Sequence, residues 1–136
     1  MRVMVLIKAN KESEAGEMPS QELLSQMMTF NEELTRAGVM LEGNGLQQSS
    51  KGARIAYSGK KRTVIDGPFT ETKELVAGYW LIDVKSKEEA IEWLKRAPFQ
   101  EGEVEIRPLF EIGDFPDASD ETRARAAEIG RQIKKS

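Results

Sequence analysis

An acidic residue inside a rigid turn is the first place in this chain where chemistry could be done. Asp66 stands directly before Gly67-Pro68-Phe69. Pro68 pushes Gly67 out of the helical region, so these residues predict a sharp exit from a strand. A carboxylate held rigidly there could act as an acid or a base at the rim of a pocket. The simpler and commoner interpretation is that Asp66 accepts hydrogen bonds from turn amides.

A charged cluster follows this turn directly. Glu71, Lys73 and Glu74 place two carboxylates and one amine close together in the chain. Paired carboxylates can separate their pKa values and serve as acid and base, but a charge cluster on a loop is usually only solvated. With Asp66 the two glutamates could bind Mg²⁺, although this spacing does not identify a metal site.

Composition excludes several classes of chemistry. The 136 residues include no cysteine and no histidine. Disulfides, thiolate metal sites and cysteine nucleophiles are therefore excluded, and the commonest general base is missing. We predict neither a metal nor a cofactor. The net charge of −3 gives no electrostatic footprint for nucleic acid.

The hydropathy pattern predicts a cytoplasmic protein. No apolar run approaches the length of a transmembrane helix. The apolar stretch after Arg2 is too short for a signal peptide, and Lys8 interrupts it. We therefore expect no membrane and no nucleic acid among its partners.

Periodicity predicts the elements that must position these residues. An apolar run at 3–7 and a longer one at 75–84 indicate buried strands. An amphipathic stripe predicts a helix that Ser20 caps and Gly38 ends. A capping box at Ser86 begins a second helix. The remaining predictions are a loop at 11–18, a strand from 39, a hairpin of strands 53–57 and 62–65, a strand alternating from 104 to 112, and a last helix that Ser119 or Asp120 caps and that ends near Lys134.

This order is β-α-β, a hairpin insertion, then β-α-β. It predicts an α+β domain with the ferredoxin-like split β-α-β fold, in which both helices cover one face of an antiparallel sheet. Met4, Leu6 and either Tyr79 or Trp80 would then lie on the uncovered face. Such a face predicts a homodimer whose sheets pack together and leave a cavity between them or at their rim. We expect the domain to span 1–115 and a helical extension to span 116–136.

Several motifs carry a resemblance to a known family. Residues 66–74, followed by Gly78-Tyr79-Trp80 and by 86–90, resemble the DGPF branch of the YCII-related family. Residues 17–20 and 45–53 are similar to it as well. The resemblance covers about 1–115 and implies a dimeric α+β barrel. It implies less about activity, because relatives discussed as enzymes use a His–Asp pair and only Asp66 matches here. An association of some members with alternative sigma factors implies a regulatory role instead.

The sequence leads us to expect a homodimer that binds a small polar or anionic molecule, and it leaves open whether the protein is an enzyme. Asp66 would be acid, base or anchoring acceptor, and Tyr79 would donate a hydrogen bond. Arg54, Glu71 and Lys73 would contact the ligand. Without a cofactor, proton transfer or isomerisation is the simplest reaction. The alternative is a non-catalytic regulatory or protein-interaction module.

Overall fold

Four strands form the central sheet of the protein in a computed structural model, which describes residues 1–133 apart from the side chain of Lys73. The strands lie in the order β2-β5-β1-β6, and every neighbouring pair is antiparallel. Their bounds are Arg2–Lys8 for β1, Met40–Gly45 for β2, Val76–Asp83 for β5 and Val104–Pro108 for β6.

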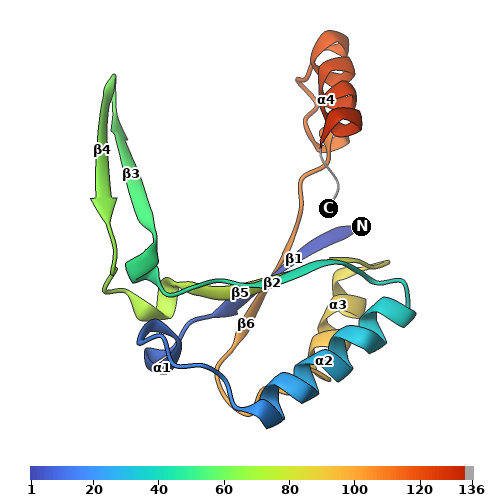
Figure 1. The fold of residues 1–136 in the computed structure, drawn as a ribbon. Coiled ribbons are helices and arrows are strands. Elements are labelled where there is room, and N and C mark those ends of the chain that lie inside the picture. The colour runs from blue at the N-terminus through green and yellow to red at the C-terminus, as the bar shows by residue number, and fades with distance from the viewer. Residues whose placement is uncertain (134–136) are drawn as a thin grey trace.

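Two helices connect these strands and cover one face of the sheet (Figure 1). Helix α2, Gln21–Arg36, joins β1 to β2, and α3, Lys87–Leu94, joins β5 to β6. Each connection is a β-α-β unit whose two strands are separated by a strand of the other unit. The predicted α+β fold with a ferredoxin-like split β-α-β arrangement is confirmed.

Serine side chains fix where the helices begin. The Ser20 side chain accepts a hydrogen bond from the backbone N–H of Leu23, and Ser86 accepts one from Glu89. Both contacts satisfy an amide that the first turn of a helix leaves without a partner. Ser119 does the same for the last helix, so it is the cap, and Asp120 is the first helical residue.

The core lies between the sheet and the two helices. Alternate residues of β1 and β5 point into it and are buried, including Val3, Val5, Trp80 and Ile82. Trp80 donates its indole N–H to the Asn31 side-chain oxygen at 2.9 Å, so its polar atom is satisfied. Of the two aromatic residues considered for the uncovered face, Trp80 therefore belongs to the core.

Strand β2 contains a bulge and a close backbone approach. Its pairing with β5 shifts between Met40 and Glu42, which leaves Leu41 as the extra residue. A Cβ atom on Gly43 would lie 2.8 Å from the Trp80 ring and 2.6 Å from the Met40 methyl carbon. The glycine therefore lets β2 pass directly over the buried indole.

The predicted hairpin is confirmed as a separate two-stranded sheet. Strands β3, Ala53–Ser58, and β4, Lys61–Asp66, pair only with each other and project from the body as an arm (Figure 1). The two-residue turn between them contains Gly59 with φ +60°, a conformation that disfavours other residues. Every residue of both strands is exposed. We call this element the hairpin arm.

The chain after β6 differs from the prediction. The alternating pattern predicted a strand through Ile112, but β6 ends at Pro108 and Phe110 is 74% exposed. The ladder with β1 ends where the Arg2 carbonyl accepts from Leu109, and the Met1 carbonyl accepts instead from Val84 on the β5 side, so residues after 109 do not continue the strand.

Residues 109–133 instead leave the sheet as a second arm, which we call the C-terminal arm (Figure 1). It contains the short 3₁₀ helix η3, Ile112–Asp114, and helix α4, Asp120–Gln132. No residue of α4 is buried. The predicted helix end near Lys134 lies outside the described residues.

Residues 11–14 form a single-turn helix, so the prediction of a loop over 11–18 is wrong at its start. Helix α1, Lys11–Glu14, has Asn10 as its cap. The Asn10 side chain accepts from the Ser13 backbone at 2.8 Å, and the Ser13 hydroxyl accepts from the Asn10 backbone at 3.0 Å. This reciprocal pair stabilises a turn that has no apolar period to reveal it.

None of the helices within residues 1–133 combines the length and the hydrophobicity that crossing a bilayer would require.

Candidate functional site

The helix-free face of the sheet carries a row of hydrogen-bonded polar side chains. Tyr79 of β5 lies opposite Asn44 of β2. Its hydroxyl donates to a Glu42 carboxylate oxygen at 2.9 Å and accepts from the Asn44 amide at 3.0 Å. Two-residue alternation puts Glu42 and Asn44 on the face opposite Gly43, which touches the core. The tyrosine hydroxyl is therefore oriented by two neighbours on the same open face.

A second polar cluster lies across the same face, on β1 and β6. The Glu105 carboxylate contacts the Lys8 amine at 3.3 Å and the Arg107 guanidinium at 3.0 Å. Hydrogen bonds from Arg107 and then from Lys8 lower the pKa of Glu105, so the carboxylate stays ionised. Two cations therefore share the Glu105 carboxylate at this end of the face.

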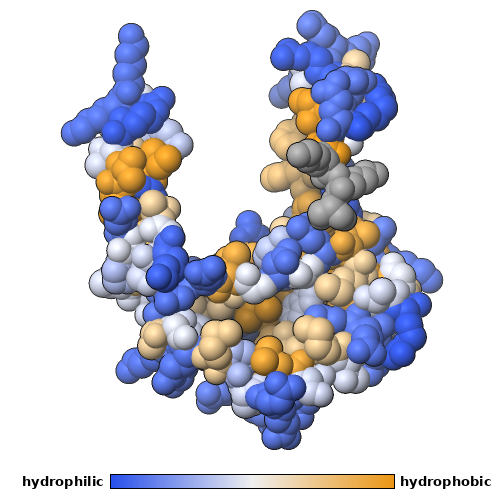
Figure 2. Space-filling view, in the orientation of Figure 1, coloured by the Kyte–Doolittle hydropathy of each residue, from blue (hydrophilic) through white to orange (hydrophobic). Residues whose placement is uncertain are grey.

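Apolar side chains separate the two clusters. Register places Met4 opposite Leu81 and Leu6 opposite Tyr79, so all four share the helix-free face. Met4, Leu6 and Leu81 are half-buried although no helix covers them. Figure 2 shows apolar surface on the floor between the two arms. The face is therefore a mixed surface with polar groups on either side of an apolar strip.

The turn at Asp66 lies at the base of the hairpin arm. Asp66 pairs with Ala53 in the last rung of the ladder. The Gly67 backbone N–H donates to Gly52 at 3.1 Å, and a Cβ atom on Gly67 would lie 1.8 Å from the Ser49 carbonyl oxygen. This contact is the physical reason for a glycine here, because any side chain would push the turn away from the 3₁₀ helix η1, Ser49–Lys51.

Ser49 connects this turn to the first helix. Its hydroxyl accepts from the Phe69 backbone N–H at 3.0 Å and donates to a Glu14 carboxylate oxygen. The other Glu14 oxygen accepts from the Ser49 backbone N–H at 2.9 Å. One carboxylate and one hydroxyl thus join α1, η1 and the turn after β4, and they fix the direction in which the hairpin arm leaves the body.

Arg54 lies over the ring of Phe69 in the same region. Its guanidinium carbon is 3.8 Å from the ring centroid, and its nitrogen is 3.7 Å from a Glu71 carboxylate oxygen. The structure therefore brings together two of the predicted ligand-binding residues, Arg54 and Glu71, beside the turn. Both side chains are about half exposed, so the pair contributes little to stability by itself.

The other predicted site residues lie apart from this pair. The Asp66 carboxylate is exposed and shows no hydrogen bond or ion pair with the described side chains or turn amides. Within the described residues, Asp66 therefore does not accept the hydrogen bonds from turn amides that the simpler interpretation required. Tyr79 lies on the sheet with Glu42 and Asn44. Lys73 belongs to the 3₁₀ helix η2, Thr72–Glu74, but its side chain lies outside the described residues.

Several residues near these positions were not identified from the sequence. Glu42, Asn44, Glu105 and Arg107 could have been placed on the open face by strand alternation, once the bulge at Leu41 is known. The pairing of Glu14 with Ser49 had no sequence signal, because 35 residues separate the two.

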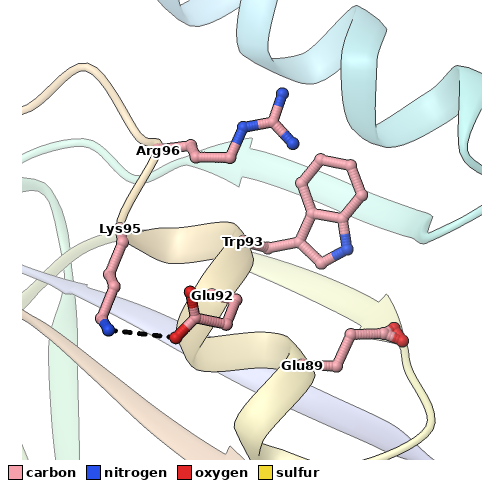
Figure 3. A pocket seen from close by; sticks show the side chains of 5 residues that line it. All are labelled: Glu89, Glu92, Trp93, Lys95 and Arg96. Atoms are coloured by element: carbon pink, nitrogen blue, oxygen red, sulfur yellow. Dashed lines mark hydrogen bonds and ion pairs between the residues drawn. The ribbon is translucent and has the colours of Figure 1, made fainter.

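Two hollows of the single chain lie elsewhere, around α3. One of about 240 Å³ is lined by Trp93, Arg96 and the charged residues near them (Figure 3). A neighbouring hollow of about 520 Å³ shares Glu89 and Trp93. Neither includes Asp66 or Tyr79. Within the part of the chain that the structure describes, no three acidic side chains gather as a metal site would need.

Two comparisons place this chain among known sequences. The model of the YCII-related domain matches residues 1–113. An uncharacterised protein of Rhizobium meliloti (strain 1021) is 37% identical over 76 residues, which is 52% of this chain and 61% of that protein. The chain thus spans less than two thirds of the relative's length.

Proposed function

The chain belongs to the YCII-related domain family, and we propose that it acts as a homodimer that binds a small polar or anionic molecule over the helix-free face of its sheet. The observation that carries the proposal is the mixed character of this face. Met4, Leu6 and Leu81 would gain from being covered, since buried apolar surface contributes about 25 cal/mol per Å². A second copy of the same face is the commonest cover for such a sheet.

The polar groups on the face favour an enclosed ligand over a dry interface. Covering Tyr79, Glu42 and Arg107 with apolar surface alone would cost free energy, because desolvated polar groups need partners. One Glu42 oxygen accepts from Tyr79, and the other can accept from a hydroxyl or an amine. The Lys8 amine and the Arg107 guanidinium beside Glu105 could also bind a carboxylate or a phosphate.

Asp66 and the Arg54–Glu71 pair would complete the site from its rim. The hairpin arm rises on the same side as the open face (Figure 1). Asp66 is the last residue of β4 and pairs with Ala53 at the base of the arm. As an exposed carboxylate it is available to anchor the ligand or to transfer a proton. The Arg54 guanidinium or the Lys73 amine would then hold negative charge, and proton transfer or isomerisation remains the simplest chemistry.

The exposed arms favour a second candidate function, a protein-interaction module without catalysis. Tyr57 on one arm and Phe110 on the other are each at least 70% exposed. Large exposed apolar side chains that gather on projecting elements are typical of interaction surfaces.

The experiment compares Tyr79→Phe with Tyr57→Phe in protein purified from its source. Native mass spectrometry would measure the oligomer and any small molecule that it retains. We expect a dimer with bound molecule in the wild type, retention lost in Tyr79→Phe and kept in Tyr57→Phe. Asp66→Asn should keep the dimer and lower retention or turnover. A dimer that retains nothing and recovers a stoichiometric protein partner would favour the interaction module.

A further inference from the structure

The hairpin arm has one apolar face, which no other element of residues 1–133 pairs with. Directly opposed residues of an antiparallel ladder point to the same side. Ile55 opposes Val64, and Tyr57 opposes Arg62, whose guanidinium lies 4.8 Å from the tyrosine ring centroid. Ile55, Tyr57 and Val64 are 53%, 70% and 66% exposed. Because an isolated two-stranded hairpin is marginally stable in water, this face needs a cover.

The C-terminal arm is ordered internally but is equally uncovered. The Arg123 guanidinium donates to the carbonyl oxygens of Ile112 at 3.2 Å, Phe115 at 2.8 Å and Ala118 at 3.3 Å. These bonds fix the segment before α4 and present the Phe110 and Phe115 rings together, with centroids 5.0 Å apart. Both rings are exposed. The arm therefore offers a preorganised apolar surface.

The two arms carry opposite charge. On the hairpin arm, 53–66, four charged residues are basic and one is acidic, namely Arg54, Lys60, Lys61 and Arg62 against Asp66. On the C-terminal arm, 109–133, six charged residues are acidic and three are basic, and the stretch before Arg123 is entirely acidic, namely Glu111, Asp114, Asp117, Asp120 and Glu121. Opposite potentials of this kind select a partner surface and its register.

Within one chain these complementary arms do not meet. The hairpin arm follows β2 and the C-terminal arm follows β6, and the strand order puts β2 and β6 at opposite edges of the sheet. Figure 1 shows both arms projecting on the same side, apart from each other, with the open face between them. Neither arm is covered by the other within residues 1–133, so a second chain is free to cover both.

A second copy can face this sheet in two ways. One two-fold axis puts hairpin arm beside hairpin arm, which brings basic residues together. The perpendicular axis in the same plane puts each hairpin arm beside the partner's C-terminal arm, which pairs basic with acidic residues and apolar with apolar surface. The charges decide between the two arrangements.

We propose that the hairpin arm of each copy packs against the C-terminal arm of the other, so that two reciprocal clasps close the dimer. The clasp rests on the proposed homodimer and adds the orientation of its two-fold axis. It also encloses the open face, since the arms of both copies then surround the space above the sheets.

A charge swap tests the clasp in the full chain. Variant A is Lys60→Glu with Lys61→Glu, and variant B is Asp117→Lys with Asp120→Lys. In an A–A or B–B dimer both clasps bring like charges together. In an A–B dimer both clasps are attractive again, because each altered arm meets an altered arm and each unaltered arm meets an unaltered one. The control is Lys85→Glu with Lys87→Glu, which makes the same charge change beside α3.

The measured quantity is the species distribution of mixed A and B by native mass spectrometry. We expect both variants to dimerise more weakly than the wild type, and the A–B dimer to exceed its statistical share by about tenfold or more, because both of its clasps pair opposite charges. Circular dichroism would check that α4 remains helical in variant B. A loss of this helix would weaken dimerisation but would not enrich the A–B dimer.

Three outcomes would be distinguishable. Enrichment of A–B, with the control variant dimerising like the wild type, supports the clasp. A wild-type dimer with A and B equally tight and mixing statistically overturns the clasp and leaves the sheet-face dimer standing. A wild-type chain that stays single at micromolar concentration overturns both, and the arms would then serve a different partner.

Discussion

Replacing Gly67 with alanine tests whether the turn at the base of the hairpin arm is held as tightly as the geometry indicates. The new Cβ atom would lie 1.8 Å from the Ser49 carbonyl oxygen and 2.6 Å from the Ser49 carbonyl carbon. Both are backbone atoms of η1 and cannot rotate away as a flexible side chain could. The turn and η1 must therefore separate.

The expected cost combines two effects. Overpacking against a well-fitted neighbour costs about 1–3 kcal/mol. Separation also lengthens the bond from the Gly67 N–H to the Gly52 carbonyl, now 3.1 Å, and a typical hydrogen bond contributes about 0.5–1.5 kcal/mol. Together they predict a loss of about 2–4 kcal/mol in the free energy of unfolding.

Urea unfolding followed by circular dichroism would measure this loss, and amide exchange at Phe69 would locate it. Gly45→Ala is the matched control, because its Cβ atom would meet nothing within 4 Å. We expect the control to stay within about 0.5 kcal/mol of the wild type. A Gly67→Ala protein with the same stability and the same Phe69 exchange as the wild type would refute the close-contact reasoning.

Three further changes probe the rest of the structure. Ser49→Ala removes the acceptor of the Phe69 N–H and should cost about 1–3 kcal/mol in urea unfolding; an unchanged midpoint would contradict the role of that hydroxyl. Leu34→Ala empties a fully buried core position and should cost about 2–5 kcal/mol by the same assay; a loss below 1 kcal/mol would mean that the core is loose. Hydrogen bonding to Arg2 lowers the pKa of Glu111 in the folded chain below its ordinary value of 4.5, so the pair stabilises the fold above that pH, and the contribution is lost as pH falls through the lowered pKa. In Glu111→Gln the free energy of unfolding should therefore fall less steeply with decreasing acidic pH than in the wild type, and an identical pH dependence would argue against the pair.

The fold could be predicted because most of its signals are local. Apolar alternation marks β1 and β5, and the caps at Ser20, Ser86 and Ser119 stand immediately before the helices that they begin. These features depend on residues within one or two turns, which a sequence displays directly.

The errors arose where a distant residue decides the structure. The pattern through Ile112 alternates like a strand, but its ladder with β1 ends at Arg2, because the Met1 carbonyl pairs with Val84 on the other side. Helix α1 lacks apolar residues and is held by the Asn10 cap and by the contact of Glu14 with Ser49.

The candidate site was only partly visible for the same reason. Asp66 and Tyr79 flank one segment of sequence, but the register of β5 carries Tyr79 to the centre of the sheet beside Glu42 and Asn44. Arg54 and Glu71 do lie together, because the hairpin returns the chain to the start of β3. Which side chains meet across the open face depends on strand register and on the bulge at Leu41, and neither can be obtained from one sequence alone.

Sedimentation equilibrium of the unmodified chain tests the central claim most directly, namely that a second copy covers the helix-free face. At micromolar concentration the account predicts a species of twice the 15.3 kDa chain mass, which shifts toward the single chain in Leu81→Asp. A wild-type protein that sediments as a stable single chain would contradict it.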